Sequence, residues 1–140
     1  MSAHFAIDPR LVADTHAIGE LPLCDLLLMD DSRFPWLILV PRIAGARELI
    51  DLDESDQRSL LAEVCAVGRT LEALLKPDKL NIAALGNVVP QLHVHLVARF
   101  ESDAAWPNPI WGRGETARYA ESARAQRIAE LRNALRTHFA

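Results

Sequence analysis

The period of the hydrophobic pattern changes partway along the chain, and this change restricts the possible folds more than any other feature. Two continuous apolar runs, residues 24–30 and 36–42, are separated by only five residues and predict two strands joined by a hairpin loop. From Asp53 to Lys76 apolar residues recur at helical spacing, with Pro77 directly after them. This segment predicts one long amphipathic helix, capped by Asp53 and ended by the proline. Its apolar stripe is expected to comprise Leu60, Leu61, Val64, Val67, Gly68, Leu71, Leu74 and Leu75.

Similar patterns predict the remaining elements on either side of this helix. A helical turn is expected at 8–13, strands at 15–21, 79–86 and 91–100, and a C-terminal helix at 115–138, after a loop at 101–114. The links between neighbouring strands are short, which favours antiparallel pairing. The prediction is therefore an α+β fold, in which an antiparallel sheet of about five strands packs with a long amphipathic helix and a C-terminal helix.

Length and composition limit the class of protein. The chain has 140 residues, of which 50% are hydrophobic, so a single domain with a sizeable core is expected over residues 1–140. Its net charge of −4 argues against binding of a nucleic acid polymer. No run reaches the roughly 18 apolar residues of a membrane span, and the N-terminus lacks the regions of a signal peptide. Cys24 and Cys65 form no CxxC pair and are expected to be reduced, so a cytoplasmic protein without membrane contact is predicted.

The expected strand at 91–100, QLHVHLVARF, has an unusual polar face. Alternate side chains of a strand point to opposite faces. One face carries Leu92, Val94, Leu96 and Ala98, and the other carries Gln91, His93, His95 and Val97. Side chains two residues apart on a strand lie roughly 7 Å apart, so the two histidines could address one small ligand together. One imidazole can attack an electrophile while the other donates a hydrogen bond or a proton.

Two other interpretations of the histidine pair stay open from the residues alone. The pair could be a hydrogen-bonded polar patch on a sheet face. It could also bind zinc, but zinc needs a third ligand, and no Cys, His or acid stands nearby at a recognisable spacing. We therefore expect neither a metal nor a cofactor.

The sequence around the two histidines resembles that of a known protein family. Gly86 and Asn87 form a small-residue turn directly before the strand. The segment KLNIAALGNVVPQLHVHLVARF resembles the histidine triad (HIT) family of nucleotide hydrolases and transferases, whose signature is His-φ-His-φ-His-φ-φ, with φ apolar. Here Gln91 stands in place of the first histidine, and His93 and His95 match the other two. LLLMDDSRFPWLILVPR, residues 26–42, also resembles the first core hairpin of the family. The resemblance covers roughly residues 15–100 and implies a HIT-like fold.

The resemblance also implies an activity and a set of roles. His93 would be the nucleophile on the α-phosphorus and form a covalent nucleotidyl-histidine, while His95 would contact the phosphate and leaving-group oxygens. Gln91 would orient these groups without transferring protons, and its amide is expected to reach the neighbouring polar groups or the turn at Asn87. Asn81, Gly86, Asn87 and Asp30 would contact the substrate, and Asp30 would meet the ribose.

Substrate and assembly follow from the same resemblance. The expected substrate is a nucleotide, such as a dinucleoside polyphosphate or a nucleoside phosphoramidate, and the expected assembly is a homodimer. Because the triad is incomplete, a nucleotide-binding module with little turnover is the alternative. Trp106 and Trp111 lie in the loop after the strand, where they could stack on a nucleobase, cap the core or fill a dimer contact.

Overall fold

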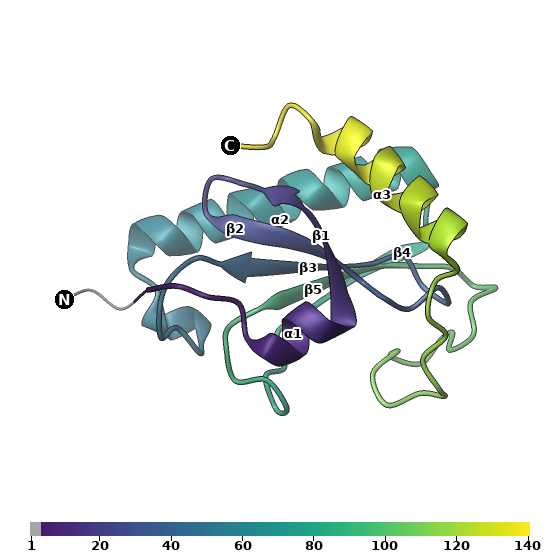
Figure 1. Cartoon of the computed structure of the whole chain (residues 1–140), viewed down its shortest axis with the longest axis horizontal. Coiled ribbons are helices and arrows are strands. Elements are labelled where there is room, and N and C mark those ends of the chain that lie inside the picture. Colours follow the sequence, from purple (N-terminus) through teal and green to yellow (C-terminus); the bar gives the residue numbers. More distant parts are fainter. Residues whose placement is uncertain (1–3) are drawn as a thin grey trace.

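The order of helices and strands follows the hydrophobic pattern. The computed structural model describes residues 4–140 and contains one five-stranded antiparallel sheet with helices (Figure 1). The elements are α1 (Pro9–Asp14), β1 (Thr15–Glu20), β2 (Cys24–Met29), β3 (Trp36–Pro41), the short 3-10 helix η1 (Leu49–Asp51), α2 (Glu54–Leu75), β4 (Lys79–Ala83), β5 (Val94–Arg99) and α3 (Glu121–Leu135). This arrangement confirms the expected α+β fold. Within residues 4–140, no helix combines the length and the hydrophobicity that are needed to cross a bilayer.

The histidine-bearing strand β5 lies inside the sheet and not at its edge. The strand order is β1-β2-β3-β5-β4, and every neighbouring pair is antiparallel. In this register His95 lies opposite Ile38 of β3 and Ala83 of β4. Because strands on both sides bond its backbone, β5 holds its alternate side chains in fixed directions.

One face of the sheet is covered by α2 and α3 (Figure 1). Asp53 caps α2 by accepting a hydrogen bond from the Asp56 N–H, and Lys76 follows the last turn in the left-handed conformation. Most of the expected apolar stripe is buried against the sheet. Leu61 and Leu74 are exceptions, with exposed fractions of 65% and 37%. At 3.6 residues per turn they lie at the two opposite edges of the buried stripe.

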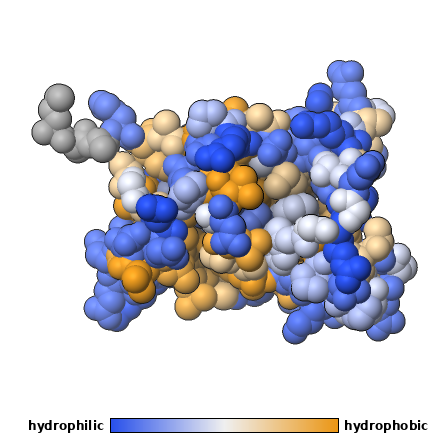
Figure 2. Space-filling view, turned by 90° about the horizontal axis from the view of Figure 1, so that it is seen from below, coloured by the Kyte–Doolittle hydropathy of each residue, from blue (hydrophilic) through white to orange (hydrophobic). Residues whose placement is uncertain are grey.

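The opposite face of the sheet carries a second hydrophobic cluster, which α1 and the loop after β5 cover. Its buried members are Leu11, Leu27, Phe34, Trp36, Ile38, Val40, Val89, Val97, Ala105 and Ile110. Figure 2 looks at the molecule from the side of α1 and shows hydrophobic surface in the middle, with hydrophilic side chains over the right-hand end. This second face is the one that holds the two histidines of the signature.

β4 ends at Ala83 and not at residue 86. Two further element boundaries differ from the expected ones because of tertiary contacts. β5 begins at Val94 and not at residue 91, because the Leu92 N–H donates to the Ala46 carbonyl outside the sheet. The C-terminal helix begins at Glu121 and not near residue 115, because the preceding segment is bonded to the turn between β2 and β3. Both differences arise from contacts between residues that are far apart in the sequence.

Candidate active site

His93 and His95 lie together on the second face of the sheet. Both side chains are buried, and their ring centroids are 4.8 Å apart in an edge-to-face arrangement. The intervening Val94 points into the core beneath α2, as the alternation of a strand requires. The structure therefore brings the two histidines into one buried pair.

The backbone determines the tautomer of His93. Its Nδ1 lies 2.7 Å from the carbonyl oxygen of Gln91. A carbonyl oxygen only accepts hydrogen bonds, so Nδ1 must carry the hydrogen. The lone pair of a neutral His93 is then on Nε2, the nitrogen that a nucleophilic imidazole would use.

His95 has the opposite tautomer because its neighbour is a donor. The indole Nε1 of Trp36, the first residue of β3, donates a hydrogen bond of 2.9 Å to His95 Nδ1. An indole N–H cannot accept, so His95 Nδ1 carries a lone pair and the hydrogen lies on Nε2. Burial, helped by the nearby His93, lowers the pKa of His95 to about 4 and keeps the ring neutral at physiological pH. Trp111 packs beside the pair, with its ring centroid 5.3 Å from that of His95.

The side chain of Gln91 points away from the histidines. We expected its amide to reach neighbouring polar groups or the turn at Asn87. Instead, its Nε2 donates to the Ala6 carbonyl and its Oε1 accepts from the Asp8 N–H, each at 2.8 Å. Gln91 thus anchors the segment that leads into α1, while its backbone carbonyl holds His93.

Asn81 and Asn87 differ in whether their side chains are already bonded within the protein. Asn81 lies opposite Val97, on the histidine face, and its Oδ1 accepts a 2.8 Å hydrogen bond from Arg99. Asn87 is exposed in the turn before β5, where Gly86 has a φ of +76° that favours glycine. Asn81 is therefore already bonded within the protein, whereas Asn87 is open to a ligand.

Asp30 is bonded to the C-terminal part of the chain. Its carboxylate accepts hydrogen bonds of 2.9 Å from the Tyr119 N–H and from Arg118. Burial by itself would raise the pKa of Asp30, but these two bonds and the contact with His16 outweigh it and lower the pKa. A sugar hydroxyl that binds Asp30 would have to share it with this segment.

A pocket beside Asp30 shares one residue, Trp36, with the surroundings of the histidine pair. It has a volume of about 320 Å³ and is lined by Asp14, Met29, Asp30, Asp31, Trp36, Thr116 and Arg118. Trp36 belongs both to this pocket and to the hydrogen bond with His95. Sequence reasoning overlooked Trp36, Arg118 and Tyr119. A tryptophan at the start of an otherwise aliphatic strand was the one signal that could have pointed to the first of them.

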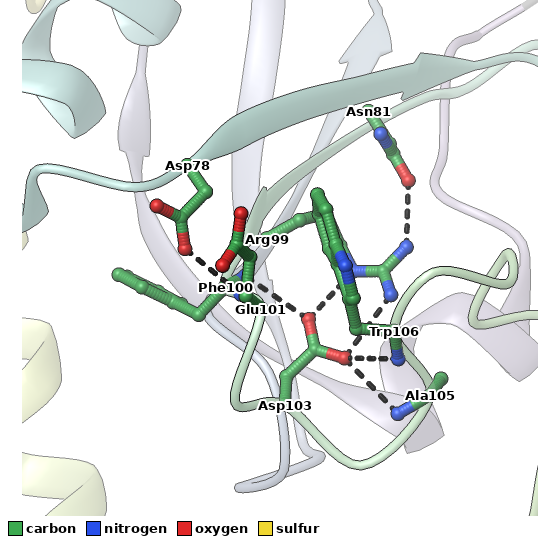
Figure 3. Close-up of polar contacts among 8 residues, drawn as sticks. All are labelled: Asp78, Asn81, Arg99, Phe100, Glu101, Asp103, Ala105 and Trp106. Carbon is green, nitrogen blue, oxygen red and sulfur yellow. Dashed lines mark hydrogen bonds and ion pairs between the residues drawn. The ribbon is translucent and has the colours of Figure 1, made fainter.

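A buried ion pair holds the loop that carries Trp111 (Figure 3). Asp103 accepts from Arg99 at 2.8 and 3.1 Å, and also from the backbone N–H groups of Phe100, Ala105 and Trp106. Burial would raise the pKa of Asp103, but these bonds lower it to about 2. Trp106 packs over the Arg99 guanidinium at 5.7 Å, so it belongs to the anchor of the loop.

Within residues 4–140, no three His, Cys, Asp or Glu side chains come together in a group that could hold a metal ion. The two histidines instead use their Nδ1 atoms in bonds within the protein.

Comparison with known proteins identifies the class to which this fold and this pair belong. Residues 10–102 match the HIT domain, and the chain belongs to the HIT family, whose members are generally nucleotide hydrolases or transferases. None of the curated proteins compared with the chain matches it.

Three similar solved structures are histidine triad proteins. The protein from Bradyrhizobium japonicum is 47% identical, with a TM-score of 0.91 over 94% of this chain and 98% of that chain. The protein from Marinobacter aquaeolei is 45% identical, with a TM-score of 0.94 over 97% and 99%. The protein from Sinorhizobium meliloti is 43% identical, with a TM-score of 0.91 over 94% and 97%.

Proposed function

We propose that this chain hydrolyses a phosphate bond of a nucleotide through a covalent nucleotidyl-histidine on His93, as a single HIT-like domain. The main support is that His93 Nδ1 donates a hydrogen bond whereas His95 Nδ1 accepts one. This leaves a lone pair on His93 Nε2 and a hydrogen on His95 Nε2. In the first step His93 Nε2 bonds to phosphorus, and the leaving oxygen departs with the electron pair of the P–O bond. In the second step water attacks phosphorus, the P–N electron pair returns to Nε2, and the proton of the water passes to solvent.

Trapping of the intermediate tests this proposal. The protein is mixed with a panel of dinucleoside polyphosphates, nucleoside phosphoramidates and sugar nucleotides, quenched at high pH, and examined by mass spectrometry. We expect a mass increase of one nucleotidyl group on the peptide that contains His93, with an acid-labile bond. Nucleotide binding without any adduct or product would instead support the second candidate, a nucleotide-binding module, which the incomplete triad favours.

The substrate-binding roles remain part of the proposal. The nucleoside would occupy the pocket beside Trp36, with its ribose near Asp30 and its base against Met29. Asn87 and the backbone at Gly86 would contact the phosphate from the turn before β5. Asn81 would act on the site through Arg99, to which it is bonded.

In this proposal Gln91 occupies the first position of the signature. It orients His93 and transfers no protons. Gln91→Ala should lower kcat/KM by about tenfold to a hundredfold, because the bonds that join Ala6 and Asp8 to the segment before β5 are lost, and each 1.36 kcal/mol is about a factor of ten. Gln91→His should stay active. The pH–rate profile should keep its shape in Gln91→Ala, and a displaced limb would show that Gln91 tunes proton chemistry.

We also propose a homodimer, formed at the unpaired edge of β4. This edge exposes Ile82, and an apolar pocket of about 390 Å³ lies between β4 and α2. Leu61 and Leu85 are exposed on α2 and after β4. An unpaired edge strand beside apolar surface is suited to pairing with a second copy.

Ile82→Lys should convert this dimer to a monomer at micromolar concentration, because a buried lysine would oppose the contact. Light scattering after size exclusion measures the mass. Val12→Lys is the matched control, because Val12 is similarly exposed on α1, away from β4. A wild-type protein that is already monomeric would contradict the proposal.

A further inference from the structure

We infer that Trp36 is a positioning residue that holds His95 in its Nε2–H tautomer and thereby limits the reaction to leaving groups that depart without taking up a proton. The inference rests on the proposed function for its reaction, but its physical basis is one hydrogen bond in the protein. The indole Nε1 of Trp36 donates to His95 Nδ1 at 2.9 Å, and both side chains are buried.

A histidine in this state can stabilise a negative charge but cannot act as an acid. Its Nδ1 has no hydrogen, so loss of the Nε2 proton would leave an imidazolate, which ordinary conditions do not allow. To become an acid, His95 would first have to bind a proton on Nδ1, where the Trp36 N–H already points. Burial and the neighbouring His93 oppose that protonation as well, since they lower the pKa of His95 to about 4.

The groups around His95 offer no replacement acid among the described residues. Ile38 of β3 and Ala83 of β4 flank it in the sheet, and Trp111 packs on it from the loop. None of these three side chains titrates. The titratable group beside His95 is His93, whose Nδ1 hydrogen is bonded to a backbone carbonyl and whose Nε2 is the proposed nucleophile.

The chemical consequence concerns the bond that breaks. When His93 Nε2 attacks phosphorus, the leaving atom takes the electron pair of its bond to phosphorus. A phosphate or pyrophosphate oxygen is stable as that anion, and the His95 N–H can hydrogen-bond it. An amine must be protonated as it leaves, and here it has no donor. The site should therefore favour nucleoside polyphosphates over nucleoside phosphoramidates.

The first test compares two substrates that share the same adenylyl group. One is ATP, whose leaving group is pyrophosphate, and the other is an adenosine phosphoramidate, whose leaving group is a primary amine. We expect kcat/KM for the amine to be lower by at least about a hundredfold, the lower end of what general acid catalysis contributes. Equal rates would overturn the inference.

Variants of the two tryptophans separate positioning from packing. Trp36→Phe keeps an aromatic ring but frees His95 Nδ1 to bind a proton, so in this variant the preference for pyrophosphate should shrink by about tenfold or more as the pH falls from about 7 to about 5, and it should stay constant in the wild type. Trp111→Phe is the matched control, because Trp111 also packs on His95 while its Nε1 has no hydrogen-bond partner in the described structure. A purely structural role of Trp36 would lower both rates and leave their ratio unchanged, and that outcome would contradict the inference.

The second test needs no substrate. Nitrogen-15 NMR of the histidine side chains in the intact protein reports which ring nitrogen carries the hydrogen. We expect His95 to be protonated on Nε2 alone at about pH 6, and to lose that preference in Trp36→Phe. A hydrogen on His95 Nδ1 in the wild type would refute the inference. If none of the nucleotides reacts, the proposed function fails, and the NMR spectrum still decides the role of Trp36.

Discussion

His93→Ala should lower nucleotide turnover by at least about a thousandfold while the protein still folds and binds nucleotide. Removal of a covalent nucleophile eliminates the route of the reaction and not merely a contact. The fold should survive because the alanine gives up one hydrogen bond to a backbone carbonyl, worth about 1 kcal/mol, and leaves a small space beside His95. Turnover is followed by product release under single-turnover conditions, and folding by circular dichroism.

A matched control is available for this variant. His138 lies after α3, far along the chain from the signature, and His138→Ala should retain nearly full turnover. Nucleotide binding by His93→Ala, measured by calorimetry, should remain within a few fold of the wild-type value. A rate near normal in His93→Ala would mean that the nucleotidyl-histidine scheme is wrong.

Asp103→Ala should reduce the free energy of unfolding by about 3 to 5 kcal/mol, the usual effect of removing one partner of a buried ion pair. Arg99 is 1% exposed, and its guanidinium would lose both of its bonds to Asp103. The loop that carries Trp111 would also lose its connections to the N–H groups of Ala105 and Trp106. Urea unfolding followed by tryptophan fluorescence measures the change.

An exposed ion pair serves as the control for Asp103. Glu54 and Arg58 pair on the surface of α2 with exposed side chains, and Glu54→Ala should have a much smaller effect. The effect of Asp103 should also depend on pH. Its folded pKa of about 2 lies below the ordinary value of 3.8, so its stabilisation is complete above the ordinary value and disappears as the pH falls toward 2. If Asp103→Ala unfolds at the same urea concentration as the wild type, the ion pair does not hold the loop.

The hydrophobic pattern was sufficient to predict most of the fold. The strands around residues 24–30 and 36–42 and the helix after Asp53 appear nearly where the pattern places them. The alternation through 91–100 also placed both histidines correctly on one face. The pattern was less informative for Leu61 and for the start of α3, because both depend on what packs against them.

The roles of individual polar groups were harder to predict than their positions. Gln91 was expected to reach the turn at Asn87, and the structure bonds it to Ala6 and Asp8 instead. Its place before the two histidines could be predicted from the sequence, but its hydrogen-bond partners lie 83 and 85 residues away along the chain. A side chain with free rotamers takes whichever partner the fold brings near, and the sequence does not name that partner.

The hydrophobic pattern is therefore enough to predict the sheet, the long helix and the shared face of His93 and His95, because the periods of strands and helices are local properties of the chain. The chemistry of that face depends instead on contacts between distant segments. Trp36 reaches His95 across 59 residues, and Tyr119 reaches Asp30 across 89. The tautomer of an imidazole depends on which donor or acceptor stands within about 3 Å of each ring nitrogen, and that is settled only when distant segments pack together.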